Sequence, residues 1–267
     1  YSDPCAEARK KAEALKKAMA EPKVKEMLNK LINDHKNAVN EHGFAIYKKA
    51  DGTYDVTTIV TSNSPTGVEF SFDAGLNIVA VVHTHPPGGS AVHSSTDILG
   101  MKDYIASPDY LGSIVTSGDQ VHLLSVTNPD QYNSFLAVVE AKGFYDKNDP
   151  TGWKDGSDIY RKFIDVRDDF IKLHMDGTDG TLPAQLYVMQ NFQLGKMKQP
   201  DGTKKNMGTG MGVSFQNYDR VTNMITPKTT VAVPKTSAGG GQTYSPGGTN
   251  VTTQNYTSID IDSDCNF

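Results

Sequence analysis

This chain of 267 residues has few cysteines, no excess of basic residues and no long apolar stretch. No run of about 20 consecutive apolar residues occurs, so the sequence predicts no membrane-spanning helix. The 26 lysines and arginines are outnumbered by 31 acidic residues, which leaves a formal net charge of −5. This balance gives no electrostatic basis for binding nucleic acid or an anionic membrane surface.

The only two cysteines lie at opposite ends of the chain, at Cys5 and Cys265. Neither has the spacing of a metal site. A disulfide between them would close nearly the whole chain and add about 4–5 kcal/mol of stability in the chain-entropy description. Because such bonds persist in oxidising compartments, we expect a secreted or periplasmic bacterial protein whose leader is absent from this chain. Two unpaired thiols are the alternative.

Residues 1–40 are predicted to form an N-terminal helical segment. Asp3 and Pro4 are a typical helix start, and apolar residues follow at helical spacing. Pro22 is expected to divide the segment into two helices, because proline lacks the N–H that a helix interior needs.

Residues 41–127 alternate between apolar and polar positions and are predicted to form the core sheet. Asp51-Gly52 and Gly118-Asp119 are hairpin signals. The expected strands cover 44–47, 54–60, 68–72, 78–82, 113–116 and 121–126, with a helix over 95–106. The sequence therefore predicts an α+β fold, in which helices flank a mixed β-sheet.

Residues 128–176 are predicted to be a helical extension of this core, with helices over 132–141 and 158–174. Trp153 between them is expected to pack in the core. Residues 177–267 are rich in Gly, Thr and Asn, and we expect a β/loop C-terminal region with strands at 185–189 and 229–233. This region could be a lid, a pro-segment or a docking module. His93 is expected to be a solvent-exposed loop histidine.

The most informative stretch is His83-Thr84-His85-Pro86, followed by Asp97. Residues two apart in a strand point to the same side, so the two imidazoles are expected to project together at the strand's end. Asp97, in the first turn of the next helix, supplies a third and anionic ligand. Three protein ligands leave a fourth tetrahedral position open, as catalytic zinc sites do.

The order His-x-His-Pro, a short loop and then Ser-x-x-Asp resembles the JAMM motif of the MPN/JAB metallopeptidases. The loop before Ser94 is about one residue longer than in the commonest members, and Ser90 and Ser95 are alternatives for the serine. The resemblance covers roughly residues 35–127. It implies an MPN-like fold, with Zn²⁺ bound by His83, His85 and Asp97.

The same resemblance implies two further catalytic roles. Glu41, just before an apolar strand, matches the glutamate that acts as general base in the family. Ser94 matches the serine that stabilises the oxyanion. Without the resemblance, Glu41 would be interpreted as a solvated acid at a strand start.

These features together predict a zinc metallopeptidase that cleaves peptide or isopeptide bonds. Its substrate would be a protein or a peptide, such as a crosslinked one, and the exported character favours a bacterial effector or toxin. A catalytically inactive MPN-like scaffold is the main alternative. A deaminase toxin is disfavoured because the sequence lacks its Pro-Cys-x-x-Cys signature, and a nuclease toxin because no basic patch is present. The oligomeric state is not predicted.

Overall fold

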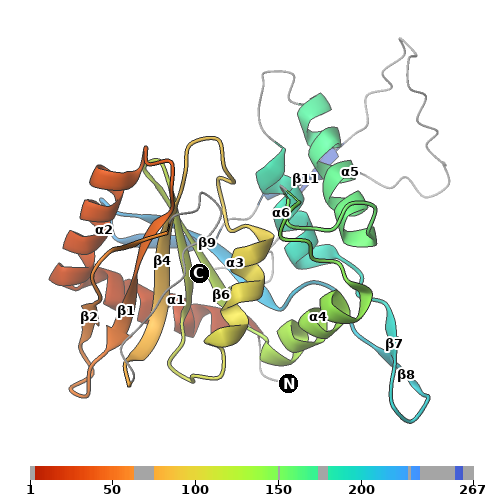
Figure 1. Cartoon of the computed structure of the whole chain (residues 1–267), viewed down its shortest axis with the longest axis horizontal. Helices are drawn as coiled ribbons and strands as arrows, with labels where there is room; N and C mark the ends of the chain where they lie inside the picture. The colour runs from red at the N-terminus through yellow and green to blue at the C-terminus, as the bar shows by residue number, and fades with distance from the viewer. Residues whose placement is uncertain are drawn as a thin grey trace.

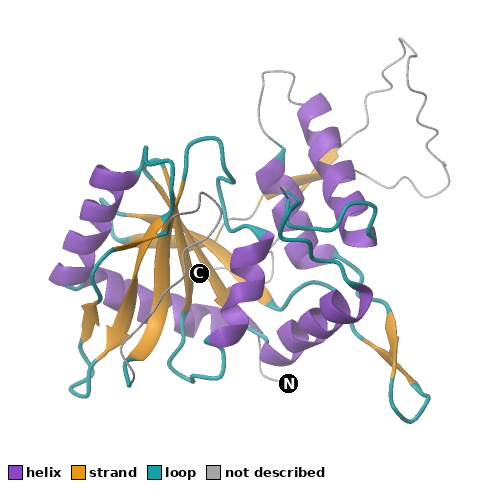
Figure 2. Cartoon of the chain, in the orientation of Figure 1, coloured by secondary structure: helices purple, strands orange, loops and turns teal. Residues whose placement is uncertain are grey.

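The computed structural model describes residues 4–62, 75–149, 151–173, 180–227, 230–234 and 256–260. They form an α+β fold in which helices cover both faces of a mixed sheet, as the sequence predicts (Figures 1 and 2). The helices are α1 (Pro4–Ala20), α2 (Pro22–His35), α3 (Ser95–Gly100), the 3₁₀ turn η1 (Met101–Asp103), α4 (Pro129–Lys142), α5 (Asp158–Leu173) and α6 (Thr181–Asn191).

The main sheet has eight strands in the order β10-β9-β6-β5-β4-β1-β2, and β3 also pairs with β1. These strands are β1 (His42–Lys48), β2 (Tyr54–Val56), β3 (Val60–Thr61), β4 (Asn77–His85), β5 (Gly112–Ser117), β6 (Gln120–Val126), β9 (Val213–Asp219) and β10 (Met224–Pro227). Only β4 and β5 run parallel, and α3 and η1 lie in the connection between them. All other pairs in this sheet are antiparallel.

Two two-stranded sheets lie outside the main sheet. One joins β7 (Lys196–Lys198) to β8 (Lys204–Asn206) and projects from the body of the molecule (Figure 1). The other pairs β11 (Thr230–Pro234) with β12 (Tyr256–Asp260).

The hydrophobic core has two parts, one on each face of the sheet. Helices α1 and α2 bury Leu15, Leu28 and Leu31 against Phe44 and Val82 of the sheet. On the other face, a larger cluster joins α3, η1, α4, α5 and α6 to β6 and β9. Because strand side chains alternate between faces, β4 serves one core with Val82 and presents its histidines to the opposite face.

The helices begin and end where local chemistry allows. Pro22 opens α2 and Pro129 opens α4, positions where the missing N–H costs nothing. Asn128 caps α4 by accepting the Gln131 N–H, and Gly143 ends that helix with a φ of 59°. The predicted division of the N-terminal segment at Pro22 is thereby confirmed.

Residues 127–212 form an excursion that leaves the sheet and returns to it. The backbone N–H groups of Thr127 and Asn128 both donate to the carbonyl of Gly212 at 3.0 Å. Strands β6 and β9, which flank the excursion, are hydrogen-bonded neighbours. Helices α4, α5 and α6 therefore lie beside the sheet. The chain leaves the sheet and returns to it at neighbouring positions, where Thr127 and Asn128 contact Gly212.

Some expectations are corrected by the structure. The apolar run 185–189 is predicted from the sequence to be a strand, but it is the central part of helix α6 (Thr181–Asn191). Its side chains are mostly buried, and the apolar ones lie in the core that also contains α4 and α5. The expected helix over 95–106 stops at Gly100 and passes into η1. The expected strand over 54–60 is divided between β2 and β3.

Other predictions are confirmed or fall on residues that the structure does not describe. Trp153 is fully buried in the core, as expected. The strand expected over 229–233 corresponds to β11. The strand expected over 68–72 lies outside the described residues, as does Cys265, so the disulfide to Cys5 stays a prediction.

Candidate metal centre

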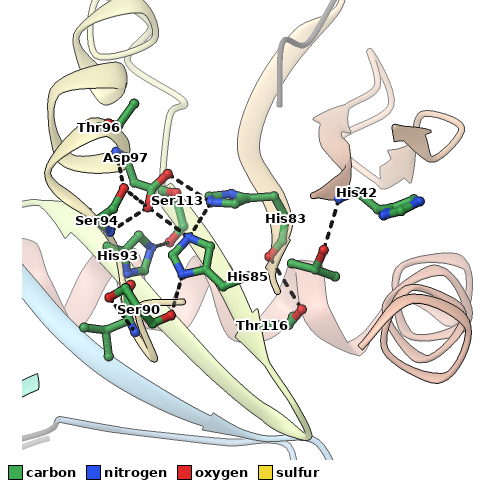
Figure 3. Close-up of polar contacts among 12 residues, drawn as sticks. His42, His83, His85, Ser90, His93, Ser94, Thr96, Asp97, Ser113 and Thr116 are labelled. Carbon is green, nitrogen blue, oxygen red and sulfur yellow. Dashed lines mark hydrogen bonds and ion pairs between the residues drawn. The ribbon is translucent and has the colours of Figure 1, made fainter. Parts of the chain in front are cut away.

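The centre lies at the end of β4, where the strand leaves the sheet. His83 and His85 point to the same side of the strand, and Thr84 between them points to the other, where its Oγ1 accepts the His42 N–H at 3.0 Å. Both imidazoles are buried (Figure 3). Strand alternation therefore places two metal-binding nitrogen atoms in one pocket.

The third ligand comes from the first turn of α3. Ser94 is the N-cap of this helix, and it forms a reciprocal capping box with Asp97. The Ser94 N–H and Oγ–H donate to Asp97 Oδ2 at 2.6 and 2.7 Å, and the Asp97 N–H donates back to Ser94 Oγ at 3.2 Å. The capping geometry thus fixes the carboxylate that faces the two histidines.

The three side chains converge closely. His83 Nε2 lies 2.9 Å from Asp97 Oδ1, and His85 Nε2 lies 3.2 Å from Asp97 Oδ2. The two Nε2 atoms are 3.2 Å apart. Ligand atoms bound at about 2.0–2.1 Å to one tetrahedral ion lie roughly 3.3 Å from each other. The cluster therefore has dimensions that suit a single metal ion.

The protonation of His85 supports this assignment. Its Nδ1 lies 2.7 Å from the carbonyl oxygen of Ser90. Because a carbonyl only accepts hydrogen bonds, Nδ1 carries the proton and a neutral His85 has its lone pair on Nε2, toward Asp97 and His83. A ligating histidine held through its other nitrogen is the usual arrangement at metal sites. A metal ion or a proton between Asp97 and the histidines would satisfy these facing atoms.

The charges in the pocket agree with a cation site. Burial alone would raise the pKa of Asp97, but the neighbouring His83 and His85 hold it well below its usual range. Burial also opposes the protonation of His85, yet the hydrogen bond and charge of Asp97 raise its pKa above the ordinary value. Asp97 is therefore ionised at neutral pH and attracts positive charge.

Glu41 lies beside these ligands. It precedes β1, in which Gly43 is paired with His83, so Glu41 two residues earlier is on the same face as the histidines. The Ser62 N–H holds its backbone carbonyl at 3.1 Å. Burial raises the pKa of Glu41 to about 7, although His83 and His85 act in the opposite direction. Its carboxyl group is buried and close to half-ionised at neutral pH.

A cleft of about 580 Å³ gives access to the centre. Glu41, His85 and Ser94 line it together. Its far wall is a loop that the sequence analysis did not single out, and it contributes Tyr145, Lys147, Asn148, Asp149, Thr151 and Gly152. The sequence signal for this loop is only a set of turn residues, so nothing local indicated that it faces the metal ligands.

The three candidate serines have different contacts. Ser94 donates its hydroxyl to Asp97, as described above. Ser95 is buried and donates to the Thr151 carbonyl at 2.8 Å. Ser90 donates to the Val92 carbonyl at 2.6 Å and offers its own carbonyl to His85. Of the three, only Ser94 has its hydroxyl on a metal-ligand side chain.

His93 is fully buried, which corrects the expectation of an exposed loop histidine. The loop turns inward at Val92 and His93, and the His93 ring packs edge-on against Phe215 of β9. Its Nε2–H donates to the Ser113 carbonyl at 3.0 Å. Burial lowers the pKa of His93 to about 3, so the ring is neutral at physiological pH. The polar residues around it in the sequence concealed this packing.

No protein-family model matches the chain, and no curated protein matches its sequence. Among the helices that the structure describes, none has the length and apolar character that crossing a membrane requires.

Proposed function

We propose that this chain is a zinc-dependent hydrolase of the JAMM type that cleaves peptide or isopeptide bonds. The observation that carries the proposal is the convergence of His83, His85 and Asp97 next to the buried carboxyl group of Glu41, at the base of an open cleft. The resemblance of these positions to the JAMM motif supports the same assignment.

The donor set favours zinc. Two imidazoles and one carboxylate are ligands that zinc accepts readily, and three protein ligands leave one position for water or substrate. Zinc bound in such a site supplies Lewis acidity and makes water a nucleophile near neutral pH.

Glu41 is the group that moves protons in this proposal. As a carboxylate it accepts a proton from the attacking water, and as a carboxylic acid it gives that proton to the departing amine. Burial raises the pKa of Glu41, which makes its carboxylate a stronger base toward the proton of water. The C–O bond forms first as water adds to the carbonyl carbon, and the C–N bond breaks afterwards, when the tetrahedral oxyanion collapses and the amine takes the proton from Glu41.

Ser94 has one hydroxyl proton, which it donates to Asp97 Oδ2. The Ser94 backbone N–H also donates to Asp97 Oδ2, so the carboxylate would keep one of its two hydrogen bonds if the hydroxyl turned to the oxygen that becomes negative during hydrolysis. One donor of this kind is typically worth roughly 3 kcal/mol of transition-state stabilisation. Ser94 would therefore both orient a ligand and stabilise the oxyanion.

The substrate class is a protein or a peptide, and the export of the chain is part of the proposal. The cleft beside the centre has a volume of about 580 Å³ and is lined by Glu41, His85 and Ser94, which would bring a peptide group next to these residues. A secreted bacterial peptidase or effector would meet crosslinked peptides or the proteins of a host or competitor.

The first test is metal content, measured by mass spectrometry on protein purified without chelator. We expect about one zinc per wild-type chain and a loss of zinc in His85→Ala and in Asp97→Ala, because each change removes one of three ligands. Asp201→Ala, an exposed aspartate in the turn between β7 and β8, is the matched control for Asp97→Ala and should retain zinc. No stoichiometric metal in the wild type after zinc is added back would contradict the proposal and favour an inactive scaffold.

The second test separates the base from the ligands. Glu41→Gln should keep its zinc and lose hydrolysis of a susceptible peptide or isopeptide by roughly 10²–10⁴-fold, the usual contribution of a general base. Glu26→Gln, an exposed glutamate on α2, should leave both properties unchanged. A fully active Glu41→Gln enzyme would show that another group moves the proton.

A further inference from the structure

A second pocket of about 250 Å³ lies beside the cleft of the metal centre. The two are adjacent because five residues line both: Gly89, Ser90, Ser94, Ser95 and Thr151. The far side of this second pocket comes from α5 and α6, helices of the excursion between β6 and β9 (Figure 1). We name it the Arg167 pocket.

The lining of the Arg167 pocket is polar, and most of its polar groups are already paired within the chain. The hydroxyls of Ser90, Ser95 and Thr151 donate to Val92, Thr151 and Asp149, and the Gln185 amide donates to the His93 carbonyl, which leaves the Arg167 guanidinium as the group that can bind a ligand. Arg167 is the only charged residue among the described residues that line the pocket, and no acidic residue faces it across the cavity. The chemistry of the walls therefore suits a small anionic group.

Arg167 is held in place from two directions. Its Nε and Nη2 donate to Asp168 Oδ1 at 3.1 and 3.0 Å, which fixes the plane of the guanidinium. Its backbone carbonyl lies so close to Gly180 that a Cβ at that glycine would overlap it. The remaining N–H groups of the guanidinium have no partner among the residues that the structure describes. A guanidinium fixed on one edge and available on the other can bind a carboxylate in the two-point manner that arginine favours.

We propose that the Arg167 pocket binds a carboxylate group of the substrate, next to the scissile bond. This inference rests on the proposed hydrolase function for the identity of the ligand as a substrate. The carboxylate belongs either to an acidic side chain or to a free C-terminus, since both present the same two oxygens. Arg167 of α5, and not the metal ligands, would then give the enzyme its preference for an acidic substrate.

Lys147 is the other cation near the centre, and it is a weaker candidate. It lines the cleft but is exposed, with no ion pair to any residue in the described part of the chain. Its flexible side chain would lose more entropy on binding than the oriented guanidinium of Arg167. Lys147 therefore provides the matched control for a test of charge alone.

The test is peptide binding, measured by titration calorimetry on the full chain after chelator treatment. Removing metal matters because a carboxylate could otherwise bind the open metal position. The probes are two pairs: acetyl-Ala-Glu-Ala-amide against its Gln counterpart, and acetyl-Ala-Ala-Ala with a free carboxylate against its amide. We expect one acidic probe to bind about tenfold or more tightly than its neutral partner. The pair that shows the difference identifies the source of the carboxylate.

Variants assign the preference to a residue. Arg167→Gln should abolish the preference, Arg167→Lys should retain part of it, and Lys147→Gln should leave it unchanged. Melting temperatures of the variants establish that each is folded. Equal binding of acidic and neutral probes, no binding of any probe, or an undiminished preference in folded Arg167→Gln would overturn the proposal.

The outcome is independent of the hydrolase assignment. If the chain prefers carboxylate probes but binds no zinc, the proposal for the Arg167 pocket is supported and the proposed hydrolase function is contradicted. A zinc hydrolase with no such preference would remove only the pocket.

Discussion

At the residue scale, the dominant feature is the cluster of His83, His85 and Asp97, whose ligand atoms face one another. Asp97 receives hydrogen bonds from Ser94 and close contacts from the two histidines, which hold its pKa well below the usual range, so it is ionised although mostly buried. Burying an ionised group without compensation costs several kcal/mol. A structure retains such an arrangement when a proton or a metal ion completes it, and the Ser90 carbonyl holds His85 with Nε2 toward Asp97 in either case.

His93 gives a prediction about stability and pH. Its pKa is about 3 in the folded chain and near 6.5 when unfolded. Between these values the unfolded chain binds the extra proton, so the folded state loses stability as the pH falls below about 6.5. From pH 7 to pH 4 the loss due to His93 should be on the order of 3 kcal/mol.

The measurement is urea unfolding of chelator-treated protein at several pH values, compared with His93→Gln. Glutamine can still donate to the Ser113 carbonyl but does not titrate. The variant should therefore lose less stability than the wild type between pH 7 and pH 4. Parallel curves would mean that His93 is protonated in the folded state.

Local sequence patterns predict only those residues of the site that lie close together in the sequence. His83 and His85 follow from strand alternation, and Ser94 and Asp97 follow from the capping pattern, so their convergence could be predicted from one short stretch of the chain. Arg167 comes from a helix far along the chain, and its place beside Ser94 depends on how α5 packs. No periodicity or spacing in the sequence carries that information.

At the scale of elements, the loop between α4 and α5 is what shapes the cleft. It closes on itself through the Lys154 N–H to the Phe144 carbonyl at 2.7 Å and the Asp146 N–H to the Gly152 carbonyl at 3.1 Å. Trp153 anchors it in the core, and Ser95 of α3 donates to Thr151. The cleft wall is therefore tied to the helix that carries Asp97.

Gly152 gives a prediction about this contact. It has a φ of +70°, and a Cβ there would overlap the Ser95 Oγ, whose rotation away would break its bond to Thr151. Gly156 is the matched control, because it has a φ of +72° and a Cβ added there would meet no atom within 4 Å. Gly156→Ala should lower the free energy of unfolding by about 1 kcal/mol because of its backbone conformation alone. Gly152→Ala should lower the free energy of unfolding by more, because it also displaces Ser95.

Urea unfolding of the two variants checks the expectation, because the backbone strain is nearly equal and only the close approach differs. Equal destabilisation of both variants would mean that the loop is free to move away from α3.

Most elements could be predicted because their signals are local. Pro22 divided the N-terminal helices, and Gly118-Asp119 marked the turn between β5 and β6. The prediction for the run 185–189 was wrong because a short apolar segment that is buried on several sides has no periodicity to distinguish helix from strand. The helical partners that bury it come from elsewhere in the chain.

At the scale of the whole molecule, the fold depends on segments that are far apart in sequence. Helices α1 and α2 cover one face of the sheet, and β9 continues it beside β6. The sequence could predict the α+β class from the kinds of element present. The strand order could not be predicted in the same way, because it depends on pairings across residues 127–212.

The cysteines give a prediction at this scale. Cys5→Ser should lower the melting temperature under oxidising conditions by roughly 10 °C, the effect of about 4 kcal/mol in a chain of this size. It should have no effect in the presence of a reductant, which is the internal control. The same melting temperature for wild type and variant without reductant would mean that the two thiols are not joined.

The position of β9 also sets an order of events during synthesis. The edge of β6 that β9 covers becomes available about 85 residues before β9 itself is made. At typical rates of translation the interval is on the order of 10 s. Throughout that time β6 presents an open edge, the kind of surface to which other chains add. Helix α5, which carries Arg167, is made within this interval. The residues of the Arg167 pocket are therefore synthesised before β9 pairs with β6.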